Sequence, residues 1–204
     1  SAARALGETP PHVMDRLPHD ALEMLAQAAA QEAKTAVQAL SAMPSETRAR
    51  LRDAALHALA QAAARDVKTA AQALVTTPPH VVARLSDAAL VALARAAARN
   101  PWHAARTLAD ITTTMPTVDP AGREDAARLL AALIAIPDGV ALDDLLTWAQ
   151  EAPLEALAHG RVIAALLDRA TNADAEAPMR AILERRLPPP DNLPPPVFAR
   201  RGRG

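Results

Sequence analysis

Three arginines and one tryptophan are the residues best suited to hold a binding partner. Arg65, Arg95 and Arg99 carry planar guanidinium groups, which pair bidentately with a carboxylate or a phosphate. Trp102 is expected at the exposed start of a helix, where an indole ring is either a binding anchor or packs against the helix end. Guanidinium groups and an exposed indole ring are suited to binding a partner rather than to catalysis.

Residues for catalysis or metal binding form no recognisable pattern. The chain has no Gly-rich phosphate loop and no G-x-S-x-G sequence. Its six His are scattered, none with a His or carboxylate partner at metal-ligand spacing on one helix face. Asp143 and Asp144 could be imagined as paired carboxylates, but acidic residues at helix starts are what the helix dipole favours. We therefore predict no enzyme, no catalytic residue, no metal site and no cofactor.

A 34-residue interval organises the elements that must position these side chains. Pro10, Pro44 and Pro78 stand 34 residues apart, and several leucines follow them at the same interval. Residues 9–42, 43–76 and 77–111 are therefore three copies of one segment, called here the first, second and third segments. Self-similarity at such a period predicts a stack of helical repeats.

Each segment divides into three short helices. The first opens at the proline, with Thr9 or Thr77 as the expected N-cap. The second covers about 12 residues and the third about nine. In the third segment Asn100-Pro101 begins the third helix, but the other two segments lack that proline. There the second and third helices could instead be one bent helix.

The second helix has a fixed apolar arc and a variable strip. At 100° per residue, seven Ala and Leu positions that are identical in all three copies cover roughly 200°, wide enough to pack against neighbours on both sides. In the first copy they are Ala21, Leu22, Leu25, Ala26, Ala28, Ala29 and Ala30. The other positions change from copy to copy, and stacking would align them in rows that a partner could contact. These rows are Glu23, His57 and Val91; Gln27, Gln61 and Arg95; and Gln31, Arg65 and Arg99. The predicted partner-binding residues are Glu23, Gln27, His57, Gln61, Arg65, Arg95, Arg99 and Trp102.

A further arginine recurs at the end of each first helix, as Arg16, Arg50 and Arg84. An aspartate follows each of them by three or four residues. The pattern indicates a salt bridge within the segment or a cap on helix carbonyls across the break. A basic ladder along one edge of the stack is the alternative.

The remaining parts of the chain are less regular. Residues 1–8 resemble the last helix of a preceding repeat, left by excision from a longer array or serving as a cap. After residue 111 the regular interval ends: Met115-Pro116 repeats Met43-Pro44 four residues late, with the insertion TTT at 112–114. We expect residues 112–187 to form degenerate capping repeats, with helices at 125–136, 142–149, 153–158, 161–170 and 178–187. Residues 188–204 are Pro-rich and basic, which predicts a disordered tail.

Composition favours an all-α fold, a right-handed α-solenoid of short helical repeats. Ala and Leu dominate, aromatic residues make up 1% of the chain, and no β-branched run reads as a strand. The three-helix unit resembles armadillo, HEAT and Pumilio repeats, although those are longer. TPPHVVA at 77–83 is similar to the opening of TAL effector repeats, which read DNA through a Gly-containing loop. Here Leu85-Ser86-Asp87-Ala88-Ala89 stands in that place, so the resemblance stops before the DNA-reading element.

These observations lead to two hypotheses for function. The first is a non-catalytic scaffold that binds a protein or an extended peptide along the strip of second helices. The alternative is nucleic-acid binding along the same strip, although the net charge of −1 argues against non-specific binding. The excess of Ala and Arg suggests a bacterial chain, expected in the cytoplasm or delivered as an effector into a host. No apolar run has transmembrane length, and we expect no membrane partner.

Overall fold

The structure is a computed structural model that describes Val13, residues 16–42 and residues 50–187, with only the backbone at Ala42, Pro79 and His80. The expected piece at 1–8, the tail at 188–204 and most of the first helices of the first two segments lie outside the described residues.

The described part of the chain is all-helical and contains no β-strand. Its elements are α3 (His19–Ala29), α4 (Ala33–Ala42), α6 (Asp53–Ala63), α7 (Val67–Thr76), α8 (Pro79–Val82), α9 (Asp87–Ala98), α10 (Pro101–Thr114), the 3₁₀ turn η1 (Met115–Thr117), α11 (Pro120–Ile134), α12 (Leu142–Glu151), α13 (Leu154–Leu157), α14 (Gly160–Thr171) and α15 (Glu176–Arg186). None of these helices is both long and apolar enough to cross a lipid bilayer.

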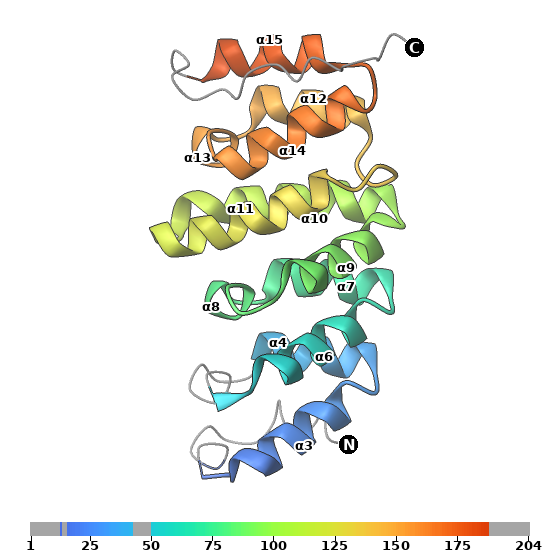
Figure 1. Ribbon diagram of the computed structural model, residues 1–204, viewed down its shortest axis with the longest axis vertical. Helices are drawn as coiled ribbons and strands as arrows, with labels where there is room; N and C mark the ends of the chain where they lie inside the picture. Colours follow the sequence, from blue (N-terminus) through green and yellow to red (C-terminus); the bar gives the residue numbers. More distant parts are fainter. Residues whose placement is uncertain (1–12, 14–15, 43–49, 188–204) are drawn as a thin grey trace, which may run out of the picture.

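Most packing is between helices that are close in sequence. α3, α6, α9, α11 and α14 contact one another in that order and form a first column. α4, α7 and α10 pack in the same way, and α12 packs on α15 in a second column. Figure 1 shows the helices following one another along the long axis, from α3 at one end to α15 at the other.

The second and third helices of each segment are separate, which resolves the alternative left open by the sequence. α6 ends before a short turn, and the Asp66 carboxylate accepts hydrogen bonds from the backbone N–H groups of Lys68 and Thr69 at 3.0 and 3.1 Å. Asn100 caps α10 in the same way, through Trp102 and His103. An aspartate is as good an N-cap as an asparagine, so the missing proline at the start of α7 makes little difference.

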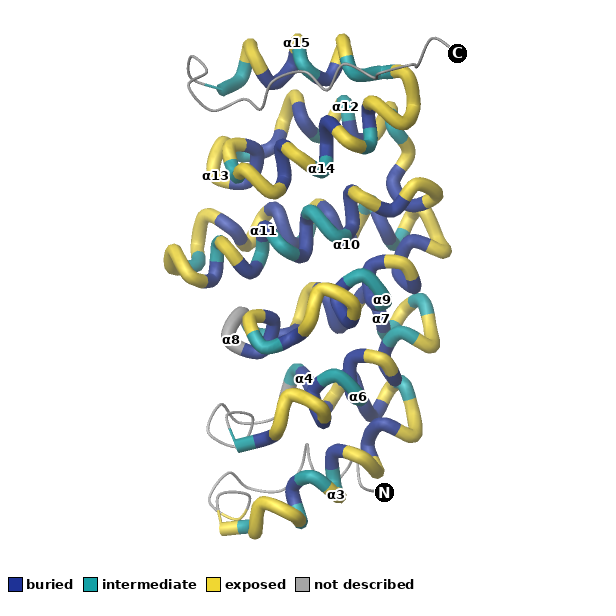
Figure 2. The backbone as a smooth tube through the Cα atoms, viewed as in Figure 1, coloured by how far each residue is buried: buried dark blue, intermediate teal, exposed yellow. Residues whose placement is uncertain are grey.

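The core consists mainly of Leu and Ala side chains. In Figure 2, buried and exposed stretches alternate along the helices of both columns. In the third segment all seven positions of the predicted apolar arc are buried, and in the second only Ala64 remains half-buried. In α3, which stands at one end of the stack, Ala21 and Leu25 are half-buried and Ala28 is exposed. Because Ala adds little bulk, close approach of the helices is what fills this core.

The expected N-cap at Thr77 and the expected helix start at Met115-Pro116 are wrong. α7 continues through Thr76, so the Thr77 N–H bonds to the carbonyl of Ala73 and its hydroxyl caps nothing. Pro78 precedes α8 instead, and its carbonyl accepts from the N–H groups of Val81 and Val82. Met115-Pro116 does not open a helix of several turns either.

The cause at Met115 lies in the inserted threonines, which lengthen α10 to Thr114 rather than forming a loop. A single 3₁₀ turn follows, and α11 begins at Pro120, five residues before the expected Asp125. The Asp119 carboxylate caps α11 by accepting from the Gly122 N–H at 2.7 Å.

Two of the recurrent arginines, Arg50 and Arg84, contact the preceding segment. Arg50 donates to the carbonyl of Leu17 at 2.5 Å, and Arg84 donates to the equivalent carbonyl of Leu51. Arg84 also pairs with Asp53 of the preceding segment at 2.8 Å. The carbonyl cap was thus predicted correctly, but its direction was not.

Candidate binding site

The predicted rows differ in how far they reach the surface. Gln27, Gln61 and Arg95 are exposed, and so are Gln31, Arg65 and Arg99. The row formed by Glu23, His57 and Val91 is half-buried. Two of the three rows are therefore open to a partner in the described structure.

The half-buried row contributes to packing. Glu23 accepts a hydrogen bond from the backbone N–H of Arg52 at 2.8 Å, and His57 Nε2 accepts one from Ser86 at the same distance. Arg52 and Ser86 are the N-cap residues of α6 and α9, so each side chain satisfies a donor at the start of the next helix in the column. Sequence reasoning missed this role, although both pairs are 29 residues apart.

Three exposed arginines lie on the rows, in two different situations. Arg65 donates to the carbonyl of Gln31 at 3.1 Å and so links the turn between α6 and α7 to the turn between α3 and α4. Arg95 and Arg99 lie one turn apart at the end of α9, and among the described residues their side chains have no acidic or carbonyl partner. These two guanidinium groups are therefore available to an external anion.

Trp102 is exposed to 61% at the first turn of α10. The guanidinium carbon of Arg106 lies 5.5 Å from the centre of its ring, within the range of a cation–π contact, and His103 meets it edge-on at 4.9 Å. The indole borders a groove of about 280 Å³ between α7 and α10, which Lys68, Gln72 and Val75 also line. An exposed indole beside a groove matches the role of a binding anchor.

These side chains belong to one helix–turn–helix element. Trp102 follows Arg99 by three positions, so their Cα atoms are at most about 11 Å apart. Arg95, Arg99, Trp102 and Arg106 are called here the α9–α10 edge. Its one acidic neighbour in the described structure is Asp110, 3.7 Å from Arg106. The edge therefore offers positive charge with an aromatic surface.

A second groove of about 350 Å³ lies among α9, α11 and α14 and was not predicted. Val91, Ala131, Ala132 and Ala165 form its apolar floor. Its charged rim is already paired, because Arg128 lies 2.9 Å from Asp87 and Arg161 lies 2.7 Å from Glu124.

These ion pairs lower the pKa values of two carboxyl groups. The hydrogen bond from Arg128 lowers the pKa of Asp87, and the hydrogen bond from Arg161 lowers that of Glu124. Both carboxylates are held in the charged form, so the rim offers little unpaired charge to a partner.

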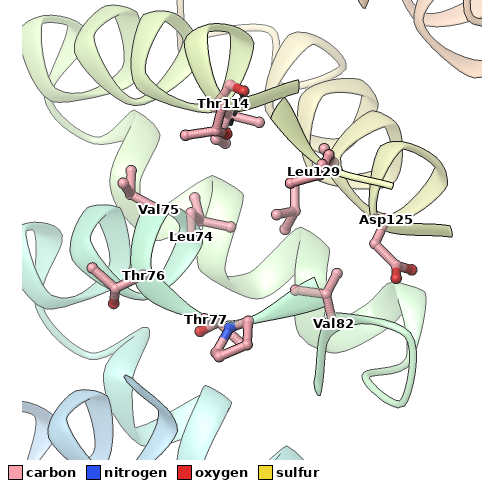
Figure 3. Close-up of a pocket in the computed structure, with 13 residues that line it drawn as sticks. Leu74, Val75, Thr76, Thr77, Val82, Thr114, Asp125 and Leu129 are labelled. Atoms are coloured by element: carbon pink, nitrogen blue, oxygen red, sulfur yellow. Dashed lines mark hydrogen bonds between the residues drawn. The ribbon is translucent and has the colours of Figure 1, made fainter. Parts of the chain in front are cut away.

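A third hollow, of about 220 Å³, lies between the end of α7 and α11 (Figure 3). Leu74, Val75 and Leu129 line its sides, and Thr114 closes it from α10. Asp125 is its one acidic lining residue, and burial raises the pKa of this carboxyl despite the nearby Arg128. The hollow therefore combines aliphatic walls with one carboxyl group.

Within the residues described, no three His, Asp or Glu side chains are close enough to hold a metal ion. Comparison of the chain with protein-family models, with curated proteins and with solved structures found no match. The function must therefore be argued from these surfaces alone.

Proposed function

We propose that this protein is a non-catalytic right-handed α-solenoid, in which three helical repeats and a degenerate cap form a scaffold for a protein partner. The sequential packing of the helices in two columns supports this architecture, because each helix rests mainly on its neighbours in the chain. Helix starts at His19, Asp53 and Asp87, which follow the sequence interval, support it further. On such a scaffold the packing residues are committed, and specificity resides in the side chains left exposed.

The partner we propose is an extended acidic segment of a protein that carries at least one apolar side chain. The observation that carries this proposal is the α9–α10 edge, where Arg95 and Arg99 lack a counter-ion in the described structure beside a Trp102 exposed to 61%. Carboxylates would pair with the guanidinium groups, and an apolar side chain would cover the indole in the groove next to Val75.

A protein partner fits these surfaces better than a nucleic acid. Phosphate backbones are bound by rows of cations that follow the strand. Here Arg50, Arg84 and Arg128 donate to backbone carbonyls of the neighbouring segment, so their charges serve packing and do not extend the edge into a stripe. Nucleic acid remains the alternative that the experiment must separate.

The test is a selection of random 15-residue peptides on the intact chain. We expect enrichment of Asp and Glu together with Phe, Leu or Trp. The double variant Arg95→Glu, Arg99→Glu should lose the selected peptides while keeping its helix content and melting temperature. Trp102→Ala should lower the affinity for the selected peptides by about tenfold or more, as expected for an aromatic anchor.

The matched control reverses two charges elsewhere. Arg52 and Arg185 are exposed on other helices, and Arg52→Glu with Arg185→Glu should leave peptide binding unchanged. Full binding by the Arg95, Arg99 variant would refute the proposed edge. Binding of single-stranded oligonucleotides, with an affinity that falls steeply as salt rises, would instead support the nucleic-acid alternative.

A further inference from the structure

The hollow in Figure 3 lies where the regular interval ends. α10 runs on to Thr114, and only the 3₁₀ turn η1 follows it before α11 begins at Pro120. The hollow is bounded by the end of α7, by Val82 of α8, by Ile111 and Thr114 of α10, and by α11. An interruption of the packing thus produces a cavity of about 220 Å³.

The side chain of Asp125 is largely buried there. The residue is 7% exposed, and among the described residues its side chain accepts no hydrogen bond. Its nearest cation is Arg128, whose Nη1 lies 3.8 Å from Oδ1, too far for a hydrogen bond.

Arg128 cannot move closer without breaking other contacts. It donates to the carbonyls of Val82 and Leu85 at 3.1 and 3.0 Å, and to Asp87 at 2.9 Å. The other charged groups that act on Asp125 are Glu124 and Asp119, both negative. A buried carboxylate in this situation gains from any additional hydrogen-bond donor.

A second polar group in the lining also lacks a partner. Thr77 is 7% exposed, and its Oγ1 is buried without a hydrogen bond. The rest of the lining is largely aliphatic, with Leu74, Val82 and Leu129 facing the hollow from three elements. The cavity therefore combines an apolar body with an anionic group.

We propose that this cavity binds a small organic cation, whose apolar part fills the space between Leu74 and Leu129 and whose ammonium group donates to the Asp125 carboxylate. An apolar cavity of about 150 Å³ holds benzene, so this one has room for about eight or nine non-hydrogen atoms. An anion of the same size is repelled by the carboxylate, and a neutral molecule offers it no charge-assisted hydrogen bond.

The experiment compares three probes of one shape on the intact chain at pH 8, followed by amide chemical shifts. Benzylamine should bind about tenfold tighter than benzyl alcohol, and benzoate should not bind. The shifts should concentrate at Thr77, Val82 and Leu129. Equal affinity for the amine and the alcohol would overturn the proposal, and so would benzylamine shifts confined to the Trp102 groove.

Two variants sharpen the result. Asp125→Asn should lower the affinity for benzylamine to that for benzyl alcohol. The control Asp144→Asn changes an exposed aspartate outside the cavity and should leave both affinities unchanged. Ala126→Leu places a larger side chain in the lining and should abolish binding of both probes. If Asp125→Asn does not fold, the three probes on the unaltered chain still decide the question.

Discussion

Replacing Arg128 by Met should destabilise the junction between the third segment and α11. The side chain is 15% exposed and donates to the carbonyls of Val82 and Leu85 and to Asp87. Hydrogen bonds that involve a charged group contribute about 1.5–3 kcal/mol each. Asp87 is 83% exposed and contributes little, since water screens that pair. Val82 keeps a second donor, the N–H of Leu85.

The two carbonyl bonds and the charge beside Asp125 therefore dominate the loss. We expect a decrease of about 2–4 kcal/mol in the free energy of unfolding, because Met retains most of the apolar stem. At about 2–4 °C per kcal/mol for a chain of this length, the melting temperature should fall by roughly 5–15 °C.

Thermal melts should be combined with amide hydrogen exchange, which reports where the protection is lost. Protection should decrease in α9 and α11 and persist in α3 and α4, because contacts in the stack are mainly between neighbours. The control is Arg106→Met, which removes a 64% exposed arginine and should cost less than about 0.5 kcal/mol. Equal melting temperatures for the two variants would refute a structural role for the arginine contacts.

Two further predictions concern the buried arc and an ion pair. Leu59 is 0% exposed, so Leu59→Asp should cost several kcal/mol in thermal melts, whereas Gln61→Asp on the exposed row should cost less than about 0.5 kcal/mol. Equal losses would mean that α6 is turned the other way. The hydrogen bond from Arg161 lowers the pKa of Glu124 below its ordinary 4.5, so this pair stabilises the fold above that pH and the contribution disappears as the pH falls through the lowered pKa. Melting temperatures of Glu124→Gln and the unaltered chain should accordingly differ at pH 6 and converge near pH 3; a gap that widens in acid would contradict the assignment.

Much of the secondary structure could be predicted because its signals are local. Ala and Leu at helical spacing, with breaks at Pro, Gly and Asp, placed α12 and α14 within two residues of their observed bounds. The same kind of signal failed at Thr77 and Met115. There the preceding helix continued up to the residue before the expected start, so Thr77 and Met115 became C-caps of α7 and α10 and could not begin a new helix.

Contacts between segments could not be assigned from the sequence, because equivalent residues recur in every segment. Asp53 and Asp87 occupy equivalent positions, so an arginine at 84 has an aspartate three residues ahead and another in the preceding segment. The repetition makes the two choices indistinguishable until the direction of stacking is known. In the structure Arg84 pairs with Asp53.

The same reasoning limits what variability reveals about function. Glu23 and His57 differ chemically, yet both accept a hydrogen bond from the start of the next helix in the column. Their variation therefore records two ways to satisfy one backbone donor, not recognition of different partners.

Where the regular interval ends, the arginine–carbonyl contact between segments is kept, but the arginine comes from a different place in the sequence. Arg50 and Arg84, each at the end of a first helix, donate to Leu17 and Leu51. One interval later the chain has Val118, and the equivalent carbonyl of Leu85 is bound by Arg128 from within α11. Because α10 is longer, this arginine now approaches from α11, which packs against α8, and the cavity beside Asp125 lies between α11 and the end of α7. The lengthened helix thus accounts both for the shifted arginine and for the proposed ligand site.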